Sequence, residues 1–255
     1  MKKWIAALLL LALMSTLCAC SLGEETPFEF KKNEDVYTCY GFKEAQSFTA
    51  DVQIPASYRD KPVRRVGSSA FAEENITSVT LEEGIERIGQ SAFAQCKKLE
   101  SVTLPNSLRN IDLAAFNECG ALRQIYIPAG VKELDTWVFL DCTALEVVVI
   151  EGELEMLDRE SFKGCSALKV IYLPGTLKDI SIDALYGCDA LEEIHFDGTA
   201  DEFLGIDFNI GWMSAENVLV CCTDRNILLE DKNTWSETDL QAVYPMDPKA
   251  ALYNP

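Results

Sequence analysis

Apolar positions recur along the middle of the chain with a fixed period of 23 residues. Five consecutive blocks align without a gap: 79–101, 102–124, 125–147, 148–170 and 171–193. Each block begins with two apolar residues separated by one position, as in Val102 and Leu104, and this alternation is typical of a β-strand. A fixed period of this length indicates one structural unit stacked on copies of itself. The pattern therefore predicts a solenoid.

The second half of each block has a different apolar spacing. An aromatic or leucine residue, a cysteine and a leucine follow one another at three-residue intervals, as in Phe93, Cys96 and Leu99. This spacing would place all three on one face of a short helical turn. Residues suited to a helix N-cap precede the turn, for example Asp112. The cysteine recurs in five blocks, at Cys96, Cys119, Cys142, Cys165 and Cys188.

These motifs resemble a known repeat. The Leu-x-x-Val-x-Leu run of residues 99–104 resembles the strand signature of leucine-rich repeats. The full unit, with Pro105 after the strand and Ala-Phe-x-x-Cys-x-x-Leu at 92–99, resembles the BspA-type bacterial leucine-rich repeat over residues 52–203. The resemblance implies an α/β repeat solenoid, a right-handed superhelix of short parallel strands. Short helical or 3-10 turns would form its return side, in about six coils with degenerate ends.

The two ends of the array are expected to be atypical, because terminal coils must cover an open core. Alternating aromatic and polar residues over 28–51 predict a hairpin-like amino-terminal cap. The stretch 198–222 resembles the way BspA-type arrays end, and Trp212 and Trp235 are expected to be apolar covers there. The predicted divisions are a signal peptide at 1–19, a linker and cap at 20–51, the solenoid at 52–203, and a cap and tail at 204–255.

The amino terminus predicts the compartment. Lys2 and Lys3 precede an apolar stretch, residues 4–14, that is too short to span a bilayer. The following Leu-Cys-Ala-Cys sequence at 17–20 resembles a bacterial lipoprotein signal. The resemblance implies cleavage before Cys20, a diacylglyceryl thioether on Cys20, and a repeat domain held at the extracytoplasmic side of the bacterial cell envelope. The alternative is an ordinary secretory signal with incidental cysteines.

The charge of the chain excludes some partners. The formal net charge is −19 at pH 7, and removal of residues 1–19 takes away two lysines and no acid, which makes it −21. Such a surface repels phosphate backbones and anionic lipids, so nucleic-acid binding is not expected. It could attract a basic partner or hold Ca²⁺ weakly. Because no Asp-x-Asp-x-Asp-Gly loop is present, a solubilising surface is the favoured interpretation, and no cofactor is expected.

The periodic cysteines are not expected to form disulfides. Equivalent positions in stacked coils have Cβ atoms about 4.8 Å apart, whereas a disulfide prefers about 3.8 Å. Free, buried thiols that behave as small apolar side chains are predicted. No metal site is expected either, because no Cys-x-x-Cys spacing occurs and the chain has one histidine. Cys39, Cys221 and Cys222 lie outside the period; a bridge from Cys39 to the others is not expected, and a vicinal Cys221–Cys222 pair is an alternative.

Catalysis is not predicted. His195 is the one candidate base of a nucleophilic triad, and it falls at an outward strand position that should face solvent. The repeat alignment places no hydroxyl or thiol beside it. Acidic residues are abundant enough to form chance pairs, but nothing in the pattern gathers them into a pocket. The protein is therefore predicted not to be an enzyme.

The outward strand positions of the middle coils suggest recognition. These apolar residues should lie side by side and His195 should be at their rim: Tyr126, Val147, Val149, Val170 and Tyr172. An exposed apolar patch with a polar rim is typical of a binding face; the alternative is that valine and tyrosine are there because they suit strands. Because the BspA type is associated with adhesion, the resemblance implies a surface module that binds a protein or glycan. A monomer is expected. The second hypothesis is an envelope-structural or accessory lipoprotein without an external ligand.

Overall fold

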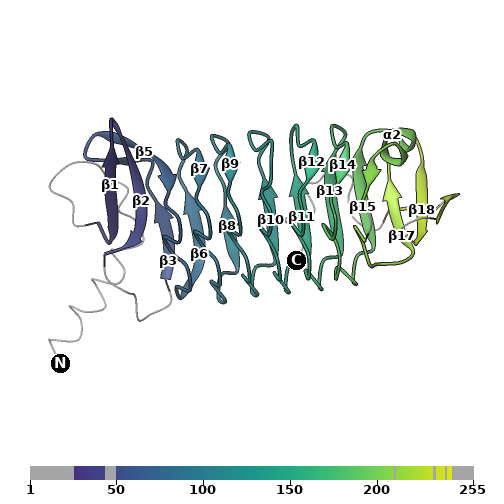
Figure 1. Cartoon of the computed structure of the whole chain (residues 1–255), viewed down its shortest axis with the longest axis horizontal. Coiled ribbons are helices and arrows are strands. Elements are labelled where there is room, and N and C mark those ends of the chain that lie inside the picture. Colours follow the sequence, from purple (N-terminus) through teal and green to yellow (C-terminus); the bar gives the residue numbers. More distant parts are fainter. Residues whose placement is uncertain (1–25, 44–49, 210, 232–233, 239, 243–255) are drawn as a thin grey trace, which may run out of the picture.

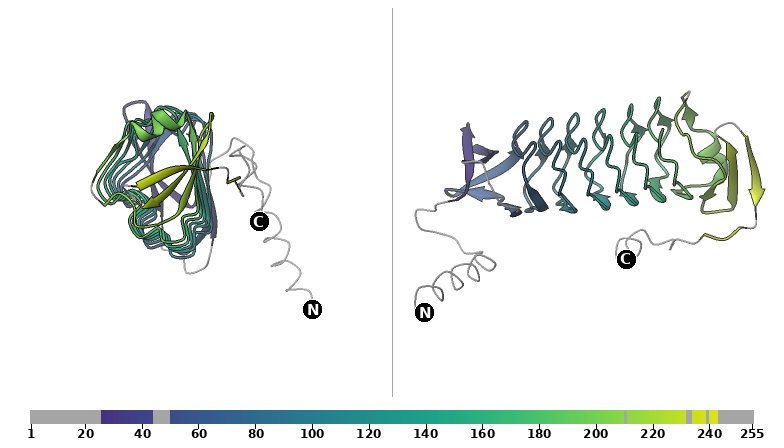
Figure 2. Two further views of the ribbon diagram at one scale, coloured as in Figure 1. Left: turned by 90° about the vertical axis from the view of Figure 1, so that its right-hand side faces the viewer. Right: turned by 90° about the horizontal axis from the view of Figure 1, so that it is seen from below.

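The computed structural model describes residues 26–43, 50–209, 211–231, 234–238 and 240–242. They form a single row of stacked coils with a β-hairpin at each end (Figure 1). Seen along the row, the coils lie almost on top of one another (Figure 2). The predicted solenoid is confirmed.

One wall of the solenoid consists of the predicted parallel strands. Its first part is formed by β3 (Ala50–Ile54), β6 (Ile76–Leu81) and β8 (Ser101–Thr103). The same wall continues with β10 (Gln124–Ile127), β11 (Val147–Ile150), β13 (Val170–Pro174), β15 (Glu193–Asp197) and β17 (Val218–Cys221). The register follows the repeat, so that Val148 lies opposite Ile171. Because side chains alternate along a strand, one column of each strand enters the core and the next points outward.

A second wall closes the other side of each coil. It is formed mainly by short parallel strands: β5 (Lys61–Val66), β7 (Arg87–Ile88), β9 (Asn110–Ile111), β12 (Met156–Leu157), β14 (Asp179–Ile180) and β16 (Asp207–Phe208). The fourth coil has no strand in this second wall. Isolated β-bridges pair its Leu134 with Ile111 of the coil before and with Leu157 of the coil after. A two-residue strand, β4 (Ser57–Tyr58), pairs antiparallel with β5.

The predicted helical or 3-10 turns on the return side are wrong. The segments around the cysteines are successive turns, because a residue in the left-handed region interrupts each of them twice, for example Ser91 (φ 53°) and Gln95 (φ 59°). Between these positions the backbone forms hydrogen bonds to the neighbouring coil. For example, the Phe93 N–H donates to the Ala115 carbonyl at 2.8 Å. The backbone groups that a helix would pair internally are thus used to connect neighbouring coils.

A ladder of aromatic rings runs through the core. The rings of Phe71, Phe93, Phe116, Phe139 and Phe162 stack with centroids 5.3–5.4 Å apart and planes within 7° of parallel. All five side chains are fully buried. Leu185 continues the same column in the last regular coil and is also fully buried. Each ring contacts the rings before and after it, so the ladder joins the coils into one core.

The periodic cysteines are free and buried, as predicted. Each thiol also donates a hydrogen bond to the carbonyl of a phenylalanine in the preceding coil, such as Cys142 Sγ to Phe116 O at 3.2 Å. Burial raises the pKa of the Cys142 thiol to about 12, so this thiol is protonated at neutral pH and can act as the donor. The ladder cysteines therefore tie neighbouring coils together as well as filling space.

The amino-terminal hairpin expected from the aromatic residues is present. Strands β1 (Phe28–Asn33) and β2 (Val36–Phe42) pair antiparallel, and β2 pairs parallel with β5. Phe28 and Phe42 both pack edge-on against Phe71, with centroid distances of 5.9 and 5.2 Å. Two perpendicular rings thus cover the first rung of the ladder.

The carboxyl-terminal end extends further than the repeat pattern indicates. After residue 203 the parallel stacking continues to β17, and β18 (Asn226–Asp231) and β19 (Thr234–Thr238) extend the sheet antiparallel. The helix α2 (Ala200–Leu204) begins with a capping box between Thr199 and Glu202. Trp212 is buried, as expected of a cover, but Trp235 is 46% exposed, so its predicted role as a cover is wrong.

Candidate functional site

The outward side chains of the parallel wall contain a second apolar cluster, separate from the core. We call it the outer cluster; it consists of Val149, Val170 and Tyr172, with Tyr126 and Val147 packed against them. The strand register brings them together, because Val149 lies opposite both Tyr126 and Tyr172. The sequence prediction that these five residues lie side by side is thus correct.

Their predicted exposure is wrong for most of the set. Val149, Val170 and Tyr172 are at most 5% exposed, and His195 is 4% exposed. Tyr126 and Val147 are half-buried, and the Tyr126 hydroxyl donates a hydrogen bond to Glu151. By contrast, the equivalent Thr80 and Thr103 of earlier coils are exposed. The accessible edge of the outer cluster therefore lies at β10 and β11. Periodicity shows which way a side chain points, but not how deeply it is buried there.

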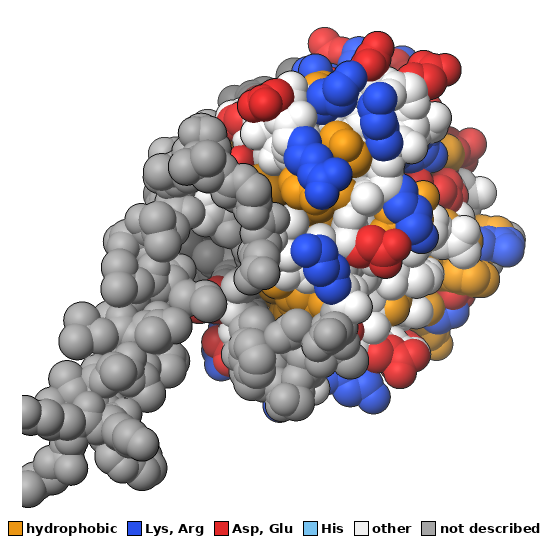
Figure 3. Space-filling model, turned by 90° about the vertical axis from the view of Figure 1, so that its left-hand side faces the viewer, with side chains coloured by type: hydrophobic (Ala, Val, Ile, Leu, Met, Phe, Trp, Pro, Cys, Tyr) orange, Lys and Arg blue, Asp and Glu red, His pale blue; other side chains and the backbone are white. Residues whose placement is uncertain are grey.

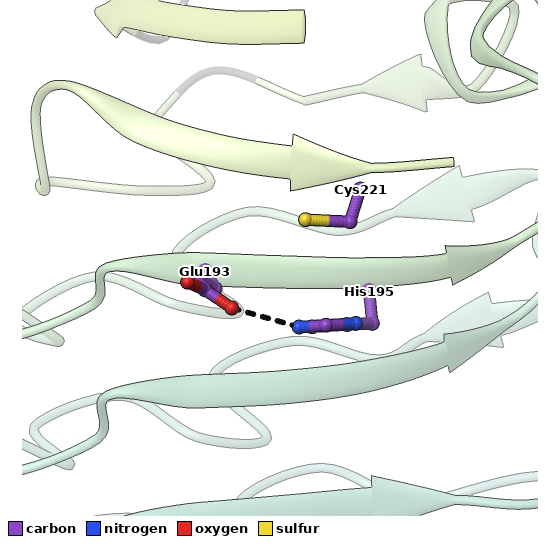
Figure 4. A group of neighbouring side chains, drawn as sticks. All are labelled: Glu193, His195 and Cys221. Carbon is purple, nitrogen blue, oxygen red and sulfur yellow. Dashed lines mark hydrogen bonds and ion pairs between the residues drawn. The ribbon is translucent and has the colours of Figure 1, made fainter. Parts of the chain in front are cut away.

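Next to the outer cluster, polar side chains from two strands converge (Figure 4). The imidazole of His195 stacks on the ring of Tyr172 with centroids 4.5 Å apart, and its Nε2 lies 2.8 Å from Glu193 Oε2. Cys221 on β17 lies opposite His195 in the register, so its thiol joins the same group. The ligand atoms of Glu193, His195 and Cys221 all lie within 4.8 Å of one another, and all three side chains are buried. The sequence prediction that no thiol stands beside His195 is wrong.

A thiol, an imidazole and a carboxylate in this order could suggest a nucleophilic triad. However, burial, together with the smaller effect of the negative charge of Glu193, raises the pKa of the Cys221 thiol to about 12. Burial also lowers the pKa of His195, which outweighs the opposing effect of Glu193. The thiol is therefore protonated and the imidazole neutral near pH 7, so the reactive thiolate is not formed. This arrangement does not favour cysteine catalysis.

Charge is unevenly distributed over the molecule. Lys and Arg side chains gather on the end formed by the amino-terminal hairpin and the first coil (Figure 3). They come from β1, β5 and the adjoining turns: Lys31, Lys32, Lys43, Arg59, Lys61, Arg64 and Arg65. Three acids compensate part of this charge, because Glu29, Asp35 and Glu86 form ion pairs with Lys31, Lys61 and Arg64. The described residues up to 66 carry seven basic and five acidic side chains, so this end has a formal charge of only +2, in a chain whose net charge is −19.

The repeat geometry agrees with a family comparison. A model of the BspA-type leucine-rich repeat region matches residues 64–201 in six copies, which is more than half of the chain. The chain belongs to the BspA-type leucine-rich repeat family. Repeats of the BspA type are typically non-catalytic binding scaffolds in bacterial surface proteins. No curated protein matches this BspA-type chain.

Solved structures with the same fold come from several bacteria. A leucine-rich repeat protein of T. pallidum is 23% identical, with a TM-score of 0.60, over 76% of this BspA-type chain and 91% of its own. A leucine-rich repeat protein of Bacteroides ovatus is 26% identical, with a TM-score of 0.50, over 71% of this chain and 56% of its own. The pneumococcal vaccine antigen PcpA is 21% identical, with a TM-score of 0.54, over 72% and 48%. These similarities show a shared fold.

The predicted lipid attachment residue, Cys20, lies outside the described residues, as does the whole predicted signal peptide. Within the described ranges, no helix is long and apolar enough to cross a membrane. The described residues nearest to Cys20 in the sequence lead into β1, at the basic end of the solenoid.

Proposed function

We propose that this protein is a non-catalytic recognition module of the bacterial cell surface that binds a protein or glycan through the outer face of its parallel wall. The observation that carries the proposal is the outer cluster. It lies outside the continuous core, so its apolar side chains are not needed to fill that core. A preformed apolar cluster beside polar side chains is the arrangement expected of the centre and rim of an interface.

The contact surface would begin at the accessible edge of the cluster. Tyr126 and Val147 are half-buried there, and Ser101, Thr103 and Gln124 on the neighbouring outward positions are exposed. Val149 and Tyr172 lie behind this edge and hold it in place by packing. A tyrosine at such a position offers a large contact area at a small cost in conformational entropy, because it has few rotatable bonds.

The double variant Tyr126→Ser with Val147→Ser is expected to weaken binding at least about tenfold, because loss of two apolar contacts at the centre of an interface costs more than about 1.4 kcal/mol. Binding of the full-length protein to an array of purified matrix proteins and glycans would identify the ligand and measure the change. Circular dichroism would show that the fold is retained, since neither residue belongs to the main core.

The control is Tyr186→Ser, which removes a tyrosine that is 49% exposed on the turn side of the solenoid. Equal binding by the double variant and this control would place the contact elsewhere on the molecule. If the full-length protein binds nothing on the array and cross-linking in cells captures only envelope proteins, the envelope scaffold without an external ligand becomes the better hypothesis.

We also propose that the protein is anchored by a lipid on Cys20. The leader sequence supports this, as does the basic end of the solenoid, which adjoins β1 and would therefore be the end nearest the membrane. Lysine and arginine near a membrane surface attract anionic lipids, each contributing about 1 kcal/mol. The strongly acidic remainder of the chain would then point away from the membrane.

Replacement of Cys20 by alanine is expected to abolish metabolic labelling with radioactive palmitate and to release the protein from the membrane fraction, because acyl chains provide the anchor. The neighbouring Cys18→Ala serves as the matched control and should leave both properties unchanged. Continued labelling of the Cys20→Ala protein would contradict the anchor and favour an ordinary secretory signal.

A further inference from the structure

The recognition proposal does not use the group formed by Glu193, His195 and Cys221, although its three side chains are typical metal ligands. Glu193 and His195 are two residues apart on β15, so both point outward from the same strand, and Cys221 comes from the adjacent β17. Their positions are therefore set by paired backbone strands. Figure 4 shows the carboxylate and the imidazole pointing toward each other, with the thiol beside them.

We propose that Glu193, His195 and Cys221 bind one zinc ion. Zinc bonds to oxygen, nitrogen and sulfur are about 2.0–2.3 Å long, so the ligand atoms of a tetrahedral site lie about 3.3–3.6 Å apart. Here the ligand atoms all lie within 4.8 Å of one another, and Glu193 Oε2 and His195 Nε2 are 2.8 Å apart. Side-chain rotations that move these atoms by about 1 Å would bring them to zinc-binding separations.

The electrostatics of the group favour a cation. The Glu193 carboxylate is 3% exposed, and its Oε2 lies against Nε2 of the equally buried His195. His195 Nδ1 is also buried and has no hydrogen-bond partner. A polar atom buried without a partner is costly, and coordination of a cation by the imidazole would offset that cost. Zinc would also deprotonate the coordinating thiol.

The mixture of ligands indicates the kind of metal. Mg²⁺ and Ca²⁺ prefer oxygen ligands, whereas a site with one sulfur, one nitrogen and one oxygen suits zinc. Three protein ligands leave one tetrahedral position for water or for a group from a partner. The site adjoins the outer cluster through the stack of Tyr172 on His195, so zinc would also fix the orientation of that tyrosine.

The test uses purified full-length protein, stripped of metal under reducing conditions and titrated with Zn²⁺ and, separately, with Co²⁺ as a spectroscopic probe. One zinc ion per chain is expected, and cobalt should give a sulfur-to-metal charge-transfer band together with the visible bands of a tetrahedral ion. Cys221→Ser and His195→Gln should each lower zinc affinity by about 100-fold.

The matched control is Cys222→Ser, which changes the adjacent cysteine. Cys222 belongs to the main core and is not part of the group, so this variant should retain the cobalt bands. Unsubstituted protein that binds cobalt without a sulfur band would overturn the proposal, even if the Cys221 variant failed to fold. Equal zinc affinity in Cys221→Ser, or loss of the bands in Cys222→Ser alone, would also overturn it.

Discussion

Replacement of Phe139 by alanine is expected to lower the free energy of unfolding by about 3–5 kcal/mol. Phe139 is fully buried and stacks between Phe116 and Phe162 at centroid distances of 5.4 and 5.3 Å. Removal of its ring would leave a cavity in the middle of the ladder, because the phenylalanine side chains of the neighbouring coils cannot move far enough to fill it. Urea denaturation monitored by far-ultraviolet circular dichroism would measure the loss. Because coils contact only their neighbours, the variant is also expected to unfold less cooperatively.

The chain itself suggests the control for this experiment. Leu185 occupies the equivalent position in the last regular coil and is fully buried there, so leucine fits this column. Phe139→Leu should therefore cost considerably less than Phe139→Ala, about 1–2 kcal/mol. Equal losses in the two variants would mean that ring stacking, and not filled volume, determines the stability of the ladder. A loss below about 1 kcal/mol in both would contradict a continuous core.

Replacement of Gly41 by alanine is expected to destabilise the amino-terminal hairpin by about 2–4 kcal/mol, combining backbone strain with a steric clash. Gly41 has φ +103°, a conformation that residues with a Cβ rarely adopt. A Cβ at this position would lie 1.8 Å from the carbonyl oxygen of Ala70, in the turn of the first coil. Since a Cβ is fixed to the backbone of Gly41 and the Ala70 oxygen is itself a backbone atom, the hairpin would have to move away from the solenoid.

Limited proteolysis would detect this movement, because a displaced hairpin exposes residues 28–42 to cleavage, and urea denaturation would give its energetic cost. Gly120→Ala is the control: its φ is not in the left-handed region, and its new Cβ would meet only Thr143 Oγ1, at 3.5 Å. That variant should change stability by less than about 0.5 kcal/mol. If Gly41→Ala resists protease as well as Gly120→Ala does, the close approach at Ala70 is not rigid.

The repeating part of the fold could be predicted because the same residues recur at the same spacing. Apolar alternation located the strands, and the columns of Phe116 and Cys119 identified what fills each coil. The conformation of the return side could not be predicted in this way. The spacing from Phe93 to Cys96 fits a helical turn, and it equally fits successive turns interrupted by left-handed residues. Only the backbone bonds to the next coil distinguish the two.

The Glu193–His195–Cys221 group could not be found from the period. His195 and Cys221 lie opposite each other although they are 26 positions apart, because the intervening coil contains α2. Counting 23 residues from His195 leads instead to Val218. The signal that could have found the group is the apolar stretch of residues 218–221, which suits a further strand and would have placed Cys221 beside His195.

The different lengths of the coils limit where the array can change in length. Between β10 and β15 the strand register advances by 23 residues from one coil to the next, and the phenylalanine and cysteine ladders keep the same step. A whole number of such coils could be added or removed there, and the phenylalanine and cysteine positions of neighbouring coils would still be aligned. The two ends differ, because Phe28 and Phe42 close the first rung and α2 sets a longer coil before β17. Coils could therefore be inserted or deleted in the middle of the array. Any longer or shorter version would have to retain the two structures that close its ends.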